Sequence, residues 1–218
     1  NTLNHLSGSE WTYFINSVIN TSYKTYGEDS YAHNIRKIHP TPKPPQLMRD
    51  IISFFTKENE LVFDYFMGVG GSLLGAALCN RHAIGIDLNK AYIDAYQCAA
   101  KQLDLNIFPT LQADCLSVLN NKEQMSTLLN GEQISLVLID PPYANMMSRE
   151  KTGGDVKVYG NVATPFTNSS LDFGNLELSD FFDSLKKSVE YVLPYVKKRG
   201  YVVVFIKDLQ PKDKEVNL

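Results

Sequence analysis

Cysteine and long apolar runs are both scarce in this sequence. Its 3 cysteines are odd in number and show no CxxC spacing, which argues against a disulfide framework and against a zinc site. No apolar run is long enough to cross a bilayer, and no basic segment followed by an apolar run marks an export signal. We therefore expect a cytoplasmic protein with no membrane association and no bound metal.

Basic residues are not in excess either. The formal net charge is -3, whereas non-specific affinity for nucleic acids comes mostly from Lys and Arg that neutralise phosphates. This charge argues against indiscriminate binding of polyanions. A nucleic-acid partner would have to be held by a local basic surface.

The length and composition fit one main domain. With 218 residues, of which 44% are apolar, the chain can bury one full-sized core but is too short for two complete domains. The sequence begins at Asn1 and stops soon after a strand pattern, which is compatible with a segment of a longer protein.

From residue 61 onward, apolar runs typical of buried strands alternate with helical patterns. Such alternation predicts a doubly wound α/β fold, with a mostly parallel sheet and helices on both faces. Strands are expected at 61–66, 83–86, 108–112, 134–139 and 201–206, and helices at 47–55, from 72, and at 89–103, 118–129 and 178–197. Residues 144–175 have no sustained period and are predicted to form a long functional or disordered loop.

Two further helical segments are expected to supply packing. Aromatic residues in a helix around 11–20 are typical of core contacts, and so are apolar residues at helical spacing near the C-terminus. The residues in question are Trp11, Tyr13 and Phe14 in the first segment and Leu178, Phe181, Phe182, Leu185, Val189, Val192 and Leu193 in the second.

A glycine-rich turn, Asp64–Ser72, lies between a buried-type strand and a helix. Glycines there let the backbone approach a ligand closely, and the following helix offers free N–H groups. A dinucleotide fingerprint would need glycine where this chain has Leu73, so nicotinamide binding is disfavoured. The structural alternative is an ordinary tight turn.

Acidic residues follow the next two strands. Asp87 is placed where a carboxylate can accept hydrogen bonds from ribose hydroxyls, and the alternative is a capping role at the following helix. Asp114 could receive the amino group of an adenine ring at the same edge of the sheet. Its alternative is a solvated carboxylate at a strand end.

The most specific motif is Asp140-Pro141-Pro142-Tyr143, directly after an apolar strand. Two prolines fix the backbone and leave carbonyls without competing N–H donors. A carboxylate beside such a carbonyl can accept both hydrogens of an NH2 group and turn the nitrogen lone pair toward a methyl sulfonium. Tyr143 offers a stacking face for a base that has left its helix.

Together these motifs resemble the DNA amino-methyltransferases that modify adenine N6 or cytosine N4. The segment His39–Leu47 is similar to the family's motif beside the methionine moiety of the cofactor, Val62–Ser72 to its main cofactor loop, and Asp140–Tyr143 to its catalytic tetrapeptide. The resemblance implies a Rossmann-like class I methyltransferase fold, S-adenosylmethionine as cofactor, and DNA with the target base flipped out. It makes 39–218 the catalytic domain and 1–38 an N-terminal extension.

The resemblance also implies the site residues. Catalytic roles fall on Asp140, Pro141, Pro142 and Tyr143. Cofactor contacts are implied for Thr41, Lys43, Pro44, Asp64, Phe66, Gly68, Gly70, Asp87 and Asp114. Lys43 has the alternative of an exposed loop charge.

This chain departs from the family at a few positions. The family usually has Pro at the position of Tyr65, Thr at that of Ser72 and often Gln at that of Pro42. No large insertion separates the motifs, so we expect target recognition in 144–175, beyond Leu218, or in a partner such as a second copy or a restriction protein. Loop residues with mixed cationic and apolar character could contact DNA or simply be solvated: Met146, Met147, Arg149, Lys151, Lys157, Tyr159 and Phe166.

Other functions stay open on the sequence alone. Adenine N6 is favoured over cytosine N4 because of the acid at position 140. An RNA guanine N2-methyltransferase can use the same tetrapeptide, although no extra RNA-binding domain is visible. A catalytically silent subunit is disfavoured by the intact Asp140 and glycines. A protein-glutamine methyltransferase typically has Asn where Asp140 stands.

Overall fold

The computed structural model describes residues 3–145 and 165–206, and its centre is a five-stranded parallel sheet. The strand order is β3-β2-β1-β4-β5. From β1, the chain adds β2 and β3 on one side and then β4 and β5 on the other. The topological switch point therefore lies between β1 and β4. The strands are β1 (Leu61–Asp64), β2 (His82–Asp87), β3 (Thr110–Gln112), β4 (Ile134–Ile139) and β5 (Val196–Val204).

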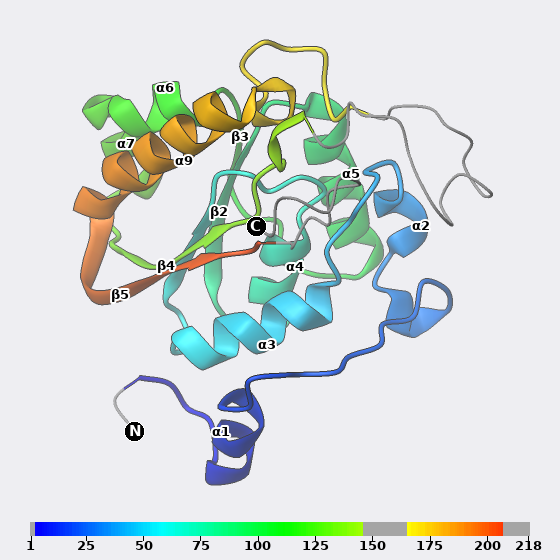
Figure 1. Cartoon of the computed structure of the whole chain (residues 1–218). Coiled ribbons are helices and arrows are strands. Elements are labelled where there is room, and N and C mark those ends of the chain that lie inside the picture. The colour runs from blue at the N-terminus through cyan, green and yellow to red at the C-terminus, as the bar shows by residue number, and fades with distance from the viewer. Residues whose placement is uncertain (1–2, 146–164, 207–218) are drawn as a thin grey trace, which may run out of the picture.

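Helices cover both faces of this sheet, as the sequence predicts (Figure 1). One face packs against α3 (Pro45–Phe55), α4 (Gly71–Ala77) and α5 (Lys90–Gln102). The other packs against α6 (Cys115–Asn120), α7 (Lys122–Leu129) and α9 (Leu178–Val192). Alternate residues of β1 explain the two layers, because Phe63 points into one core and Val62 into the other, and both are fully buried.

The N-terminal arm carries three short elements. They are α1 (Gly8–Phe14), η1 (Glu28–Ser30) and α2 (His33–Arg36). The first helix begins earlier and ends earlier than the expected 11–20, because Ser7 and Glu10 form a capping box at its start. Trp11 and Phe14 are half-buried and pack on the Phe54 ring, with ring centroids 4.9 and 5.1 Å away, as expected. The expectation is wrong for Tyr13, which is exposed.

The last helix is shorter than the sequence indicates. It ends at Val192, and a 3-10 turn, η4 (Leu193–Tyr195), leads into β5 at Val196. Pro194 explains the difference, since proline lacks the N–H that a continuing helix would donate. Phe181 and Val192 face the core as expected, whereas the expectation is wrong for Leu178, Phe182 and Leu193, which are exposed.

The helix expected at 118–129 is in fact two helices. Asn121 separates them in an extended conformation, and its side chain caps α7 by accepting a hydrogen bond from the Gln124 N–H. Within the expected loop 144–175, residues 146–164 lie outside the described part, which includes most of the loop residues singled out above. The described end of the loop contains η3 (Phe173–Asn175). The division into 1–38 and 39–218 stays a prediction.

Candidate active site at the carboxyl edge of the sheet

The predicted motifs meet at the carboxyl ends of β1, β2 and β4. Asp64 ends β1, Asp87 ends β2, and Asp140 directly follows β4. Burial is the main cause that raises the pKa of the Asp64 carboxyl, and the charges of Asp140 and Asp87 raise it further. Three acids thus share one edge beside the switch point, where ligands of open α/β sheets bind.

The glycine-rich turn is held in place by contacts that only glycine permits. Gly70 has a φ of +73°, and a Cβ there would lie 2.2 Å from a ring carbon of Tyr96. A Cβ at Gly71 would lie 2.7 Å from the carbonyl oxygen of Lys43. The turn therefore packs directly against α5 on one side and against the proline-rich segment on the other.

Asp64 is a buried residue that holds this turn through two hydrogen bonds. Its carboxylate accepts hydrogen bonds from the Phe66 N–H, at 2.9 Å, and from the Ser72 hydroxyl. Burial raises the pKa of Asp64 to about 7, although both hydrogen bonds act in the opposite direction. Ser72 therefore supplies the hydroxyl that the threonine usual at this position would supply, so this departure from the family costs no contact with Asp64.

Asp87 ties the turn to the end of β2. One carboxylate oxygen accepts the Gly68 N–H at 2.8 Å, and the other accepts the Asn89 N–H at 2.8 Å. Burial raises the pKa of Asp87 to about 6, while these two bonds lower it. Asn89, rather than Asp87, caps α5. Because each carboxylate oxygen has a further lone pair, the half-buried acid can still accept hydroxyl groups.

Asp114 has a clear structural role. It caps α6, and its side chain accepts hydrogen bonds from the Ser117 N–H at 2.8 Å and the Ser117 hydroxyl at 2.6 Å. The half-buried carboxylate lies one strand farther out than Asp87, because β3 is the edge strand. An adenine contact from Asp114 stays a prediction.

Both oxygens of the Asp140 carboxylate face hydrogen-bond donors. The Lys43 ammonium lies 2.6 Å from Oδ2, and the Tyr143 hydroxyl lies 3.2 Å from Oδ1. The same hydroxyl also lies 3.2 Å from the carbonyl oxygen of Phe205, so the tyrosine ring is fixed at its far end. Burial and the Asp140 charge raise the pKa of Tyr143, which keeps its hydroxyl protonated. Sequence reasoning gave no role to Phe205.

The proline-rich segment brings Lys43 to this acid. Pro44 is the N-cap of α3, which starts at Pro45 with proline in the favoured first position. Buried Arg36 holds the segment by donating to the Lys43 carbonyl at 2.8 Å. Thr41 is exposed, and its N–H donates to the His39 ring at 3.1 Å. The sequence contained no signal for Arg36, because a single arginine in a polar stretch has no periodic context.

The segment 165–175 returns over the same edge. The Phe166 ring stacks on His39 with centroids 5.0 Å apart, and its carbonyl accepts from the side chains of Asn89 and Tyr92, each at 3.4 Å. Phe173 packs edge-on against Phe66, at 5.0 Å between centroids. This segment thus contacts the proline-rich segment, the cofactor turn and the start of α5. Sequence reasoning placed Phe166 in a candidate functional loop but did not predict these contacts, because they join distant parts of the chain.

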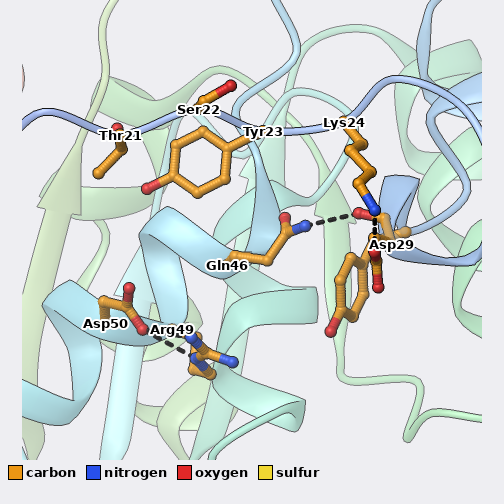
Figure 2. Close-up of a pocket in the computed structure, with 9 residues that line it drawn as sticks. Thr21, Ser22, Tyr23, Lys24, Asp29, Gln46, Arg49 and Asp50 are labelled. Carbon is orange, nitrogen blue, oxygen red and sulfur yellow. Dashed lines mark hydrogen bonds and ion pairs between the residues drawn. The ribbon is translucent and has the colours of Figure 1, made fainter.

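A cavity of about 390 Å³ lies elsewhere, between the N-terminal arm and α3 (Figure 2). Its lining contains none of the predicted site residues, and it includes the ion pairs of Lys24 with Asp29 and of Arg49 with Asp50. Among the described residues, no group of His, Cys, Asp and Glu could hold a metal ion. Nor is any helix in 3–145 or 165–206 long and apolar enough to span a membrane.

The residues at the carboxyl edge fit an adenosyl cofactor. The turn at the end of β1 is held by glycines packed against Tyr96 and Lys43, and the half-buried Gly68 within it has a φ of +50°. The Asp87 carboxylate lies beside the half-buried Gly68, and its contact with sugar hydroxyls stays a prediction. Thr41, Lys43, Phe66 and Asp114 lie around this centre, but their individual contacts to a cofactor stay predictions.

Comparison with known sequences finds methylases and methyltransferases. The profile of the DNA methylase family matches residues 7–98. The type II methyltransferase M1.MboII of Moraxella bovis is 33% identical over 85 residues, which is 39% of this chain and 33% of that protein. The tRNA (guanine(10)-N2)-dimethyltransferase of Methanocaldococcus jannaschii is 27% identical over 150 residues, which is 68% of this chain and 42% of that protein. The crystal structure of PH0851 superposes with a TM-score of 0.50 at 13% identity, over 75% of this chain and 32% of that one.

The parallel sheet with helices on both faces is a Rossmann-like fold of the class I methyltransferase type, and the cofactor of this class is S-adenosylmethionine. Residues 7–98 match the profile of the DNA methylase family, which the motifs also resemble. The chain spans less than half the length of the two curated relatives above.

Proposed function

We propose that this protein transfers a methyl group from S-adenosylmethionine to an exocyclic amino group of a base in DNA, with adenine N6 favoured over cytosine N4. The observation that carries the proposal is the Asp140 carboxylate. It lies at the switch point beside the cofactor turn, and donors approach both of its oxygens. A carboxylate set up to accept N–H or O–H groups there can accept the hydrogens of an amine.

The cofactor, when bound, supplies an electrophilic methyl group on a positively charged sulfur. Asp140 accepts a hydrogen of the target amine and orients the nitrogen lone pair toward that methyl group. After transfer, the nitrogen carries one proton too many, and Asp140 is the nearest acceptor for it. Pro141 and Pro142 stiffen the backbone behind the acid. Tyr143, anchored through its hydroxyl, offers its ring to a flipped base.

Asp64, Asp87 and the turn hold the cofactor in this proposal. Asp87 accepts the ribose hydroxyls, and Gly68 and Gly70 allow close approach of the backbone. Asp64 acts indirectly, because its carboxylate fixes the Phe66 N–H and the Ser72 hydroxyl. We expect the loss of one of these hydrogen bonds to weaken cofactor binding more than it slows methyl transfer.

RNA methylation at guanine N2 is the second candidate. It is favoured by the tRNA methyltransferase relative, whose similarity extends over 68% of this chain. The DNA assignment has more support, because a family profile and the type II methyltransferases match the chain. A silent subunit is disfavoured by the intact ion pair and the intact turn. Location in the cytoplasm, a homodimer and a restriction or recognition partner stay proposals.

The experiment measures transfer of radiolabelled methyl groups from S-adenosylmethionine to duplex DNA and to total RNA in parallel, followed by nucleoside analysis. We expect N6-methyladenine from DNA. Label on RNA alone would move the assignment to the second candidate. Asp140→Asn should lower transfer at least about 100-fold, which is the scale for loss of a positioned acid-base group. The matched control is Asp94→Asn, which removes an exposed acid on α5 and should leave transfer intact.

A further inference from the structure

Lys43 connects the cofactor turn to the catalytic acid. Its carbonyl oxygen touches the start of α4, where a Cβ at Gly71 would lie only 2.7 Å away, and it accepts a hydrogen bond from Arg36. Its ammonium reaches Asp140, and it also lies 5.9 Å from the centroid of the Phe205 ring. The two paired side chains are 27% and 20% exposed, so the contact is partly shielded from water.

This pairing places a cation beside an oxygen that an incoming amine could use. Tyr143 holds Oδ1 of Asp140, and Lys43 holds Oδ2. Each oxygen keeps a further lone pair, but the ammonium at 2.6 Å offsets the charge of the carboxylate, so an amino group meets a weaker acceptor while this ion pair is intact. The tyrosine is anchored a second time at the Phe205 carbonyl, whereas the flexible lysine side chain has no second carboxylate partner among the described residues. Lys43 is therefore the donor that can move away from Asp140.

The methyl donor must lie close to the same point. In a reactive arrangement the methyl carbon is about 3–3.5 Å from the attacking nitrogen, and that nitrogen is within hydrogen-bond distance of Asp140. A positively charged sulfur would therefore stand within several ångströms of the Lys43 ammonium. Two like charges so close, in a partly shielded site, repel each other.

We propose that Lys43 is a positioning residue that senses the charge of the bound cofactor, an inference that rests on the proposed function. Without the cofactor, Lys43 forms an ion pair with Oδ2 of Asp140. This ion pair weakens when the methylated, positively charged cofactor is bound. Oδ2 then becomes a stronger acceptor for the target amine. After transfer the cofactor sulfur is neutral, so Lys43 returns to Asp140 and disfavours a base beside spent cofactor.

The test compares binding of S-adenosylmethionine, whose sulfur is charged, with S-adenosylhomocysteine, whose sulfur is neutral, by titration calorimetry without nucleic acid. Lys43→Met removes the ammonium and keeps the length of the side chain. We expect this change to raise the preference for the charged ligand about 3- to 10-fold, the scale for unit charges several ångströms apart near a protein surface. Lys43→Arg keeps the charge and should keep the wild-type preference.

Lys197→Met is the matched control. Lys197 pairs with Glu60 at the opposite, amino end of the sheet, and these side chains are 29% and 24% exposed, close to the values for Lys43 and Asp140. Losing this ion pair should leave the ligand preference unchanged. General loss of stability therefore cannot imitate the expected result.

A second variant tests the proposal from the other side of the ion pair. Asp140→Asn leaves the Lys43 ammonium without its counter-charge, so the preference for the charged ligand should fall below that of wild type. Opposite shifts in Lys43→Met and Asp140→Asn would support the role of Lys43. An unchanged preference in Lys43→Met, or in Asp140→Asn if the lysine variant does not fold, would overturn it. Failure of the wild-type protein to bind either ligand would overturn the proposed function itself, and this inference with it.

Discussion

Gly70 and Tyr96 are packed so closely that no side chain fits between them. A Cβ at Gly70 would lie 2.2 Å from one ring carbon of Tyr96 and 2.6 Å from another. The Tyr96 ring cannot easily move away, because it is fully buried and its hydroxyl accepts the Phe108 N–H at 2.8 Å. This contact sets the position of the cofactor turn relative to α5.

Gly70→Ala should therefore destabilise the protein strongly. The left-handed backbone costs an alanine about 1–2 kcal/mol, and overpacking against Tyr96 adds about 1–3 kcal/mol. Unfolding in urea measures the loss. Gly131→Ala is the matched control, because Gly131 has a φ of +86° but no atom within 4 Å of its added Cβ. It should lose only the backbone part, and equal losses in the two variants would contradict the steric argument.

Asp64 should make stability depend on pH. Burial raises its pKa from 3.8 to about 7, so in this interval the folded protein holds a proton that the unfolded chain has released. The free energy of unfolding should therefore decline as pH rises from about 4 to 7 and then level off. Asp64→Asn cannot titrate, and its stability should decline less over the same interval.

The measurement is urea unfolding of wild type and Asp64→Asn at several pH values between 4.5 and 8, compared as a difference. The difference is needed because Asp87, whose pKa burial raises to about 6, contributes in the same direction in both proteins. Parallel curves for the two proteins would show that the Asp64 carboxyl is not perturbed as the structure indicates.

The sequence predicted the parts of the site that lie at strand ends. Buried strands read as continuous apolar runs, and each motif followed such a run, so their meeting at one edge of a parallel sheet could be inferred from Asp64, Asp87 and Asp140 alone. The strands β1, β2 and β4 begin and end within two residues of the predictions. The local sequence pattern was sufficient there, because each motif directly follows the apolar run that forms its strand.

The contacts of the site could not be predicted in this way. Pairing of Lys43 with Asp140 joins residues far apart in the chain, and so does stacking of Phe166 on His39. Such pairs depend on how loops cross the sheet edge, which has no period in the sequence. Helix ends were missed for a related reason: Pro194 and Asn121 act through single backbone groups that hydrophobic patterns do not reveal.

Loss of the Asp87 carboxylate should weaken cofactor binding while the fold persists. Asp87→Asn keeps an acceptor oxygen for only one of the backbone N–H groups of Gly68 and Asn89, and it loses the charge that favours hydroxyl donors. We expect the dissociation constant for S-adenosylmethionine to rise about tenfold, since hydrogen bonds to charged groups are worth about 1.5–3 kcal/mol. Calorimetric titration measures it, with Asp94→Asn as the surface control. Equal affinities for wild type and Asp87→Asn would exclude the ribose role.

His39 should stay uncharged far below the usual pH for histidine. Burial, and to a lesser extent the nearby Lys43 charge, lower its pKa from 6.5 to about 4. Proton NMR can follow the ring signals of the 4 histidines as pH falls, and His39 should keep its neutral chemical shift to about pH 4. Phe166→Ala removes the ring stacked on His39, admits water and should raise its pKa toward 6.5. Phe182→Ala, which trims an exposed ring on α9, should leave the His39 titration unchanged. If Phe166→Ala also leaves it unchanged, segment 165–175 does not cover this edge of the site in solution.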